Sequence, residues 1–368
     1  MTKKFSSETN LPWWKKGVIY QIYPRSFNDT SGNGIGDLKG ISKKISYLSS
    51  LGVDAIWLSP IFTSPMKDMG YDVSNYTDID PLFGNIHDFE RLIEKAKENK
   101  IKVIIDQVLS HSSDAHPFFK ISKSNKNNSK SDWYVWADPK PDGSPPNNWL
   151  SVFGGSAWEW DTGREQYYLH NFLKSQPDFN FHNLEVQKWL LSTVKFWLEK
   201  GVDGFRLDTA NYYFHDKKLR NNPAIKSRTS GKNPYYYQNL KYSINQKDNF
   251  AFLKKLRKLT DEYKETTMIG EISNVELQAK YTANNDKLHM AYSFDLLRDE
   301  FSPKHIRNTV SKFFKETKDG WPTWSFSNHD VVRHLSRWNK IKKDTQKFAK
   351  LTCALLMSLK GTPCIYQG

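Results

Sequence analysis

Short apolar runs punctuate this chain, and longer amphipathic segments separate them. Eight runs have the length of strands and few polar interruptions, which is typical of parallel strands buried on both faces. The predicted strands span residues 18–23, 55–59, 103–109, 204–208, 267–272, 290–294, 323–327 and 363–366.

Between the runs, apolar residues recur at helical spacing. Such stripes lie at 41–48, 89–96 and 186–198, and a last one runs through Phe348, Leu351, Leu355 and Leu359. Alternation of strands and helices predicts βαβ units and a parallel sheet. Eight such units in 368 residues predict an α/β fold, a (β/α)8 barrel of ~250 residues that carries an insertion.

Two stretches interrupt this alternation. Residues 110–180 are rich in Ser, Asn, Pro and aromatic residues and are too long for a strand–helix loop, so we expect a small inserted domain B there. The barrel would then occupy residues 1–109 and 181–368. Residues 212–249 could form a lid or a wall. The sequence stops at Gly368, directly after the eighth run, so we expect the last helix and a C-terminal β-domain to be missing.

Composition narrows the functional classes. The net charge of +14 could indicate a nucleic-acid or membrane partner, but the lysines are spread along predicted helix faces, which favours a solvated surface and no nucleic-acid role. The N-terminus has no apolar signal region and no 18-residue apolar run occurs, so we expect no membrane partner. Cys353 and Cys364 lie in apolar patterns; we expect both to be buried and reduced, as in a cytoplasmic protein.

Acidic residues mark the ends of three predicted strands: Asp208, Glu271 and Asp330. In a parallel barrel all carboxyl ends of strands meet at one face, so these groups converge. A pair of carboxylates around an acetal carbon is the equipment for cleaving a glycosidic bond. A lone acid at a strand end is more often a cap or an ion-pair partner, but three of them favour carbohydrate chemistry.

Several ordered motifs carry a family resemblance. The chain opens with the run from Trp13 to Phe27, WWKKGVIYQIYPRSF, and closes with GTPCIYQG; between them lie GFRLD, IGE and FSNHD. Together they resemble glycoside hydrolase family 13, the α-amylase superfamily, and within it the α-glucosidase and oligo-1,6-glucosidase branch. QPDFN, from Gln176 to Asn180, matches the fifth motif of that branch.

The resemblance implies roles for the acids. Asp208 would be the nucleophile that forms a covalent glycosyl-enzyme, and Glu271 the general acid and then base, with a pKa raised by burial and by Asp208. Asp330 would favour the distorted transition state. Arg206 would keep Asp208 ionised. The sugar would receive hydrogen bonds from two histidines, His111 and His329.

The resemblance also implies a pocket that is closed at one end. In the segment DMGY, Tyr71 would stack on the terminal glucose and Asp68 would bind its outer hydroxyls, which makes an exo-acting enzyme. Phe153 and Phe172 are candidate pocket walls. Each aromatic residue could equally serve core packing.

The segment from Asp29 to Asp37, DTSGNGIGD, resembles the family's loop for Ca²⁺ or Mg²⁺. Oxygen ligands from Asp29, Ser31, Asn33, Asp37 and the Ile35 carbonyl would suit a hard cation. Ser31 and Asn33 stand where relatives often have Asn and Asp, which weakens binding. The alternative is a Gly-rich turn stabilised by its own side chains. We expect no organic cofactor.

Ser110 stands where most members of the resembled family have an Asn that supports the site by hydrogen bonds, a role that a Ser could partly fill. Thr209 stands next to Asp208; in the resembled branch, Thr or Ala at this place accompanies α-1,4 activity and Val accompanies α-1,6 activity. The sequence thus predicts a retaining exo-α-glucosidase acting on α-1,4 or sucrose-type bonds of small oligosaccharides, with transglycosylation as an added activity. Alternatives are a trehalose-6-phosphate hydrolase, an oligo-1,6-glucosidase or a sucrose isomerase. From another class, the chain could be a non-catalytic barrel module or an inactive fragment.

Overall fold

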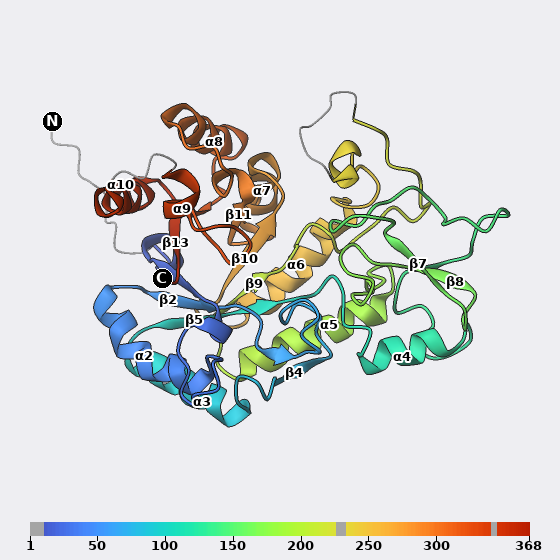
Figure 1. Cartoon of the computed structure of the whole chain (residues 1–368), viewed down its shortest axis with the longest axis horizontal. Coiled ribbons are helices and arrows are strands. Elements are labelled where there is room, and N and C mark those ends of the chain that lie inside the picture. The colour runs from blue at the N-terminus through green and yellow to red at the C-terminus, as the bar shows by residue number, and fades with distance from the viewer. Residues whose placement is uncertain (1–10, 226–232, 340–343) are drawn as a thin grey trace.

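The computed structural model describes residues 11–225, 233–339 and 344–368. Within these ranges eight parallel strands form one sheet in the order β11-β10-β9-β5-β2-β1-β13-β12. A parallel bridge between Ala291 and Pro322 brings the two edges of this sheet together. The chain is therefore a (β/α)8 barrel, as the strand–helix alternation predicted (Figure 1). Its strands are β1 (Ile19–Ile22), β2 (Ala55–Leu58), β5 (Lys102–Gln107), β9 (Gly204–Leu207), β10 (Thr267–Ile272), β11 (Met290–Ser293), β12 (Thr323–Ser325) and β13 (Thr362–Tyr366).

Helices form the outer layer of the barrel. Polar side chains fix where they begin: Asp37 accepts from the Gly40 N–H at the start of α2, and Asn183 accepts from the Glu185 N–H at the start of α5. The long helices are α2 (Leu38–Leu51), α3 (Ile86–Glu98), α5 (Leu184–Glu199), α6 (Asp248–Asp261), α7 (Val275–Thr282), α8 (Pro303–Glu316) and α10 (Thr345–Ser358), with short helices α1 (Trp13–Lys16) and α9 (His334–Trp338).

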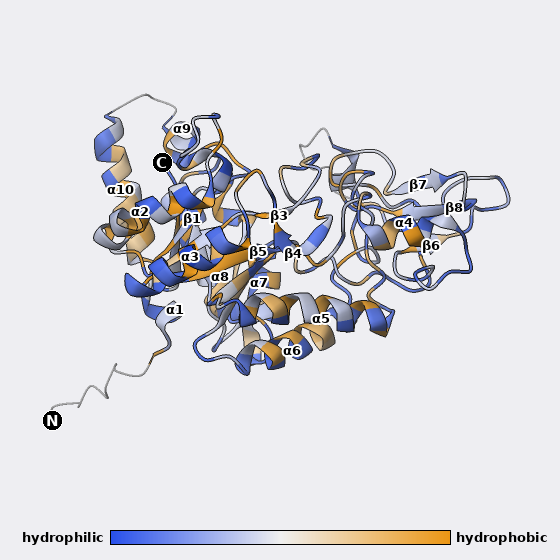
Figure 2. Cartoon of the chain, turned by 90° about the horizontal axis from the view of Figure 1, so that it is seen from below, coloured by the Kyte–Doolittle hydropathy of each residue, from blue (hydrophilic) through white to orange (hydrophobic). Residues whose placement is uncertain are grey.

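Side chains of the strands alternate between two apolar clusters. On β9 and β10, Phe205, Leu207 and Met268 join the cluster under α2, α3, α5 and α6, whereas Ile269 joins a second cluster with Ile104 from β5. This period of two places one set of residues under the helices and the other inside the barrel. Figure 2 shows the strands at the centre in orange, while α5 and α6 carry both colours.

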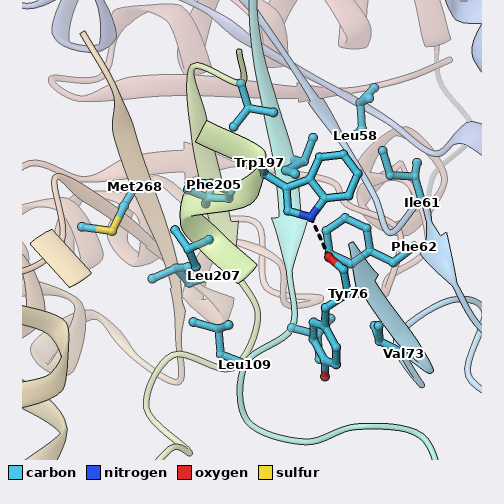
Figure 3. Close-up of a cluster of buried hydrophobic side chains, with 14 of the residues drawn as sticks. Leu58, Ile61, Phe62, Val73, Tyr76, Leu109, Trp197, Phe205, Leu207 and Met268 are labelled. Atoms are coloured by element: carbon cyan, nitrogen blue, oxygen red, sulfur yellow. Dashed lines mark hydrogen bonds between the residues drawn. The ribbon is translucent and has the colours of Figure 1, made fainter. Parts of the chain in front are cut away.

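The apolar cluster under α2, α3, α5 and α6 also anchors a hairpin that the sequence did not predict. This hairpin pairs β3 (Phe62–Thr63) with β4 (Asn75–Ile79). In Figure 3 the Trp197 indole of α5 packs on Phe62, with ring centroids 5.0 Å apart. The Trp197 Nε1 donates to the Tyr76 carbonyl oxygen at 2.7 Å. Helix α5 thereby holds the hairpin close to the carboxyl ends of the strands.

Residues 110–180 form structure of their own beside the barrel. They contain α4 (Pro117–Ser124) and a three-stranded antiparallel sheet of β6 (Trp136–Ala137), β8 (Gln166–Leu169) and β7 (Trp158–Asp161). These elements lie together on the right of Figure 1. Trp149 Nε1 donates to the Arg220 carbonyl oxygen at 2.9 Å, so this segment contacts the connection after β9. Part of the predicted lid or wall, residues 226–232, lies outside the described residues.

Two expectations about α10 were wrong. Cys353 is exposed rather than buried, although Cys364 in β13 is buried as expected. Leu351 is 57% exposed, although Phe348, Leu355 and Leu359 of the same stripe are partly buried against the cluster that contains Leu356. Helical spacing therefore identified the helix and most of its covered side, but not the exposure of Leu351. None of the described helices is both long and apolar enough to cross a membrane.

We expect Trp197→Ala to lower the free energy of unfolding by about 3–5 kcal/mol, because it leaves a cavity under the hairpin. Trp197→Phe keeps a ring against Phe62 and loses the bond to Tyr76, so its cost should be about 1–2 kcal/mol. Denaturant unfolding measures both. Trp160→Ala, at a site 38% exposed, is the control. An equal loss in Trp160→Ala and Trp197→Ala would contradict the anchoring role of Trp197.

Candidate active site

The three acids from separate strands line one cavity of about 1640 Å³. Asp208 directly follows β9, Glu271 lies in β10, and Asp330 lies in the connection after β12. Asp208 and Glu271 are 5% and 6% exposed, whereas the Asp330 side chain is 42% exposed. The Asn328 side chain donates to Asp330 at 3.0 Å and holds it at the cavity. The three acids therefore converge on one cavity, as their positions at the strand ends predicted.

Arg206 connects the carboxyl groups below the cavity. Its buried guanidinium lies 2.8 Å from Asp106, 2.8 Å from Asp208 and 2.7 Å from Glu271. Its Nη2 also donates to the Tyr292 hydroxyl at 2.7 Å. Because Arg206 and Asp208 are two residues apart at the end of β9, their side chains point to the same side.

Burial dominates the protonation of this cluster. It raises the pKa of Asp106 to about 6, of Asp208 to about 7 and of Glu271 to about 8. Arg206 lowers all three pKa values, as predicted for Asp208, but the loss of solvent outweighs it. The Asp208 and Glu271 carboxyls both contact the Arg206 guanidinium, at 2.8 and 2.7 Å, so the two acids titrate together. One positive charge does not compensate both carboxylates, so the pair retains a proton at neutral pH.

Tyr71 and His329 form the side of the cavity next to this cluster. Their rings stack with centroids 5.4 Å apart, and the Tyr71 hydroxyl lies 2.6 Å from His329 Nε2 and donates to Asp106 at 3.0 Å. Burial lowers the pKa of His329 to about 4, so its imidazole is neutral at neutral pH. Asp68 lines the same cavity and accepts from Gln176 Nε2 at 2.8 Å.

His111 lies in the connection that follows β5 and contacts the backbone of Tyr71. Its Nδ1 is 2.8 Å from the Ser110 hydroxyl, and its Nε2 is 3.1 Å from the Tyr71 carbonyl oxygen and 3.2 Å from Gln176 Nε2. Burial lowers the pKa of His111 to about 4. Both ring nitrogens of His111 thus contact protein groups. The same holds for His329, whose Nδ1 lies 2.8 Å from Gln21 Nε2, so a bound sugar would exchange with these contacts.

Aromatic side chains line the outer part of the cavity. Phe172 lies 5.2 Å from His111, 5.5 Å from Tyr212 and 5.9 Å from Phe153 between ring centroids. Phe153 is 55% exposed. Tyr235 contributes from the 212–249 stretch, with its hydroxyl 2.6 Å from that of Tyr212. Both stretches that interrupt the barrel therefore supply residues to the cavity wall.

Thr209 has an unusual backbone beside both acids. Its φ is +41°, a left-handed conformation that a β-branched residue rarely adopts. Its N–H donates to Glu271 at 3.0 Å, and its hydroxyl donates to Asp208 at 3.3 Å. These bonds explain how the strain is maintained.

The Asp29–Asp37 loop is closed by its own side chains. Asp29 accepts from the N–H groups of Ser31, Gly32 and Gly34, and Asn33 accepts from Ile35. Backbone hydrogen bonds lower the pKa of Asp29, led by that from Gly34. No cluster of three or more His, Cys, Asp or Glu side chains is placed to hold a metal within the ranges described here. The donor set, all oxygen, fits a hard cation, and the same bonds fit a plain turn; metal binding stays a prediction.

Three residues of the site were missed. Asp106 and Tyr292 hold Arg206, and Gln176 bridges Asp68 and His111. Asp106 and Tyr292 lie near the carboxyl ends of the observed strands β5 and β11, but in the middle of the predicted strands 103–109 and 290–294, so the strand-end rule did not select them. Gln176 stood in a motif noted for its family resemblance, but its sequence position carries no signal of contact with Asp68.

Comparisons with known proteins agree with this geometry. The sequence profile for "Alpha amylase, catalytic domain" matches residues 21–368. A probable α-glucosidase of Rhizobium meliloti (strain 1021) is 54% identical over 98% of this chain and 68% of its own length. An oligo-1,6-glucosidase of Heyndrickxia coagulans is 41% identical over 97% of this chain and 66% of its own.

A trehalose-6-phosphate hydrolase of Bacillus subtilis (strain 168) is 38% identical over 97% of this chain and 64% of its own length. Among solved structures, the α-glucosyl transfer enzyme XgtA superposes with a TM-score of 0.95 at 54% identity, covering 98% of this chain and 68% of that protein. The chain thus spans about two thirds of the length of these relatives.

The raised pKa of Glu271 predicts a pH-dependent stability. The folded chain keeps a proton that the unfolded chain releases, so the stabilisation is complete below pH 4.5 and is lost as pH rises through about 8. Glu271→Gln replaces the carboxyl by an amide that does not titrate, so it removes this contribution. Its melting temperature should fall less between about pH 5 and pH 9 than that of the unchanged chain. Glu199→Gln, on the exposed end of α5, is the control; parallel curves for all three proteins would refute the buried proton.

Proposed function

This chain belongs to the α-amylase family of glycoside hydrolases, and we propose that it is a retaining, exo-acting α-glucosidase. Its substrates are short oligosaccharides with a terminal α-linked glucose, preferably in α-1,4 or sucrose-type linkage. The observation that carries the proposal is the pair of Asp208 and Glu271, whose buried carboxyls both contact the Arg206 guanidinium in one cavity.

The spacing of this pair favours retention. Inverting glycosidases keep their carboxyls about 6.5–9.5 Å apart to admit a water molecule, and retaining enzymes about 5–5.5 Å. The Asp208 and Glu271 carboxyls contact the two terminal nitrogens of one guanidinium, at 2.8 and 2.7 Å, which favours the closer spacing. The pair therefore supports double displacement.

The two steps follow from the protonation of the pair. Ionised Asp208 attacks the anomeric carbon, the glycosidic C–O bond breaks, and Glu271 gives its proton to the departing oxygen. Glu271, now ionised, then takes a proton from water, whose oxygen displaces Asp208 and releases glucose. Replacing the water by a sugar hydroxyl in this step gives transglycosylation. Asp330, at the edge of the cavity, would bind the hydroxyls of the reacting sugar and favour its distorted form.

Exo action is supported by the closed side of the cavity. Asp68 is fixed by Gln176 from the inserted segment, and Tyr71 is fixed by His329 and Asp106. A terminal glucose would fit against Tyr71, with its outer hydroxyls near Asp68. Phe153 and Phe172, which line the outer part, would contact the leaving group.

The linkage rests on Thr209, whose side chain lies in the cavity wall beside Asp208. A methyl group near the reacting bond typically changes discrimination by ~1–3 kcal/mol. Other linkages, trehalose 6-phosphate hydrolysis and sucrose isomerisation are the alternatives. Relatives named oligo-1,6-glucosidase and trehalose-6-phosphate hydrolase support the first two, and a trehalulose synthase is among the similar solved structures. Lys241 and Arg298 line the outer cavity, but Arg298 is paired with Asp295. We therefore rank the phosphorylated substrate second.

We expect Asp208→Asn to reduce glucose release from maltose and sucrose by roughly 10³-fold or more, because the covalent step is lost. Asp138→Asn, an exposed acid far from the cavity, should keep full activity and serves as the control. Isomaltose and trehalose 6-phosphate complete the substrate panel. Initial release of α-glucose, followed by NMR, should accompany turnover.

Each outcome of this assay is informative. Release of β-glucose first would exclude double displacement. Undiminished turnover by Asp208→Asn would refute the nucleophile assignment. A folded chain that turns over none of the four substrates would favour the non-catalytic barrel or the inactive fragment over the enzyme.

We also propose that the loop from Asp29 to Asp37 holds Ca²⁺ or Mg²⁺ as a structural ion, with oxygen atoms of Asp29, Asn33 and Asp37 among the ligands. Removing the ion with a chelator should lower the melting temperature by a few degrees, because bound ligand stabilises the folded state. Asp29→Asn should abolish this response. A melting temperature that does not change between metal-free and Ca²⁺-containing buffer would contradict the metal site.

A further inference from the structure

A chain of hydroxyl groups connects His111 to Asp208. The Ser110 hydroxyl, at the end of β5, lies 2.8 Å from His111 Nδ1 and 2.9 Å from the Thr209 hydroxyl. The Thr209 hydroxyl in turn lies 3.3 Å from Asp208 Oδ2. Ser110 is 1% exposed, so water does not replace these bonds.

The charge of Asp208 sets the direction of this chain. An ionised carboxylate only accepts hydrogen bonds, so Thr209 must donate to it. The Thr209 oxygen then accepts from Ser110, and the Ser110 oxygen accepts from His111, whose single proton stands on Nδ1. The imidazole is neutral, since burial lowers the pKa of His111 to about 4.

The other ring nitrogen of His111 is compatible with either state. Gln176 is oriented by the Leu173 N–H, which donates to its oxygen at 2.9 Å, so its amide nitrogen faces His111 Nε2 as a donor. The Tyr71 carbonyl oxygen, 3.1 Å from the same Nε2, can only accept. One neighbour favours a bare Nε2 and the other a protonated one, so the choice passes to the hydroxyl chain.

We infer that Ser110 and Thr209 form a relay that couples the tautomer of His111 to the charge of the nucleophile. With ionised Asp208, the relay runs toward the carboxylate and His111 carries its proton on Nδ1. When Asp208 no longer attracts the Thr209 proton, the relay reverses: Thr209 donates to Ser110, Ser110 donates to Nδ1, and His111 carries its proton on Nε2. The imidazole carries one proton in both states, so the reversal changes neither its charge nor the number of protons in the relay.

The consequence for catalysis rests on the proposed function. Esterification of Asp208 by glucose removes its negative charge and weakens its attraction for the Thr209 proton, so the Nε2–H tautomer of His111 would gain population while the sugar is covalently bound. Ser110 and Thr209 would then act as positioning residues, which work through His111 and Asp208. Two strand ends, those of β5 and β9, are adjacent in the sheet and hold the two hydroxyls together.

Asp208→Asn offers a test that needs no turnover. Arg206 donates to one oxygen of Asp208 at 2.8 Å, so the amide oxygen of this variant must face Arg206 and its NH₂ must face Thr209. The NH₂ donates to the Thr209 hydroxyl and reverses the relay. ¹⁵N NMR of histidine-labelled chain distinguishes the two tautomers, and His111→Gln identifies the His111 signals by their loss. The spectra are taken at about pH 8.5, above the pKa of Asp208.

We expect an Nδ1–H tautomer in the unchanged chain and an Nε2–H tautomer in Asp208→Asn. In the background of Ser110→Ala, or of Thr209→Val, the same change at position 208 should leave the tautomer as it is. Ser110→Thr keeps a hydroxyl and should restore the response. An identical tautomer with Asp and Asn at position 208 would overturn the relay, as would a response that survives Ser110→Ala.

Kinetics give an independent readout. Ser110→Ala should lower kcat/KM for the preferred substrate by about two- to tenfold, the effect of losing one hydrogen bond, and Ser110→Thr should recover it. Equal losses in both variants would indicate a packing role alone and count against the relay. If the unchanged chain hydrolyses nothing, the proposed function fails, while the tautomer comparison still decides the relay.

Discussion

The buried guanidinium of Arg206 is the interaction on which the site depends. It meets three carboxyls at hydrogen-bonding distance in a place without solvent. One positive charge cannot balance three negative ones, so the cluster keeps a proton at neutral pH. In the proposed mechanism, that imbalance makes Glu271 the proton donor and Asp208 the nucleophile. Loss of the guanidinium would leave carboxyls that must all protonate, and the division of roles would disappear.

The sheet makes this cluster possible by its register. Asp106 and Arg206 are partners on the adjacent strands β5 and β9, and Arg206 is the partner of Ile269 on β10. Glu271 follows two residues later on the same face. Gly270 lies between Ile269 and Glu271. A Cβ at this position would stand 2.3 Å from the Cδ1 atom of Leu288, so a side chain here would displace Leu288. The backbone register of three neighbouring strands therefore places the carboxyls of Asp106 and Glu271 beside the Arg206 guanidinium.

The sequence predicted these strands well because each is a continuous apolar run. Every predicted barrel strand begins within one residue of the observed one and ends within two, and residues 267–272 coincide with β10. It did not predict β3 or β6, which have two residues each and are too short to show a period, nor β4, β7 and β8, whose buried positions do not alternate. In α10 the periodicity identified Phe348, Leu355 and Leu359 as core-facing, but it did not reveal that Leu351 and Cys353 are exposed. The acids were found by their place at strand ends, whereas Gln176 and Tyr292 depend on contacts across more than eighty residues.

The cavity has an inner part, formed by the acids and Arg206, and an outer wall, and the two are built differently. Sequence identity to relatives therefore bears on each part separately. The acids and Arg206 stand on strand ends whose geometry the barrel fixes. The outer wall, with Phe153, Phe172 and Tyr235, comes from the two long connections, whose residues contact each other. The positions of the acids therefore depend on the barrel, and the shape of the outer wall depends on the connections. The Ser110–Thr209 pair lies where the two parts meet, since the Ser110 carbonyl accepts from Phe179 of the inserted segment while its hydroxyl faces the nucleophile strand. Substitutions at this junction can alter how the sugar is held without displacing Arg206.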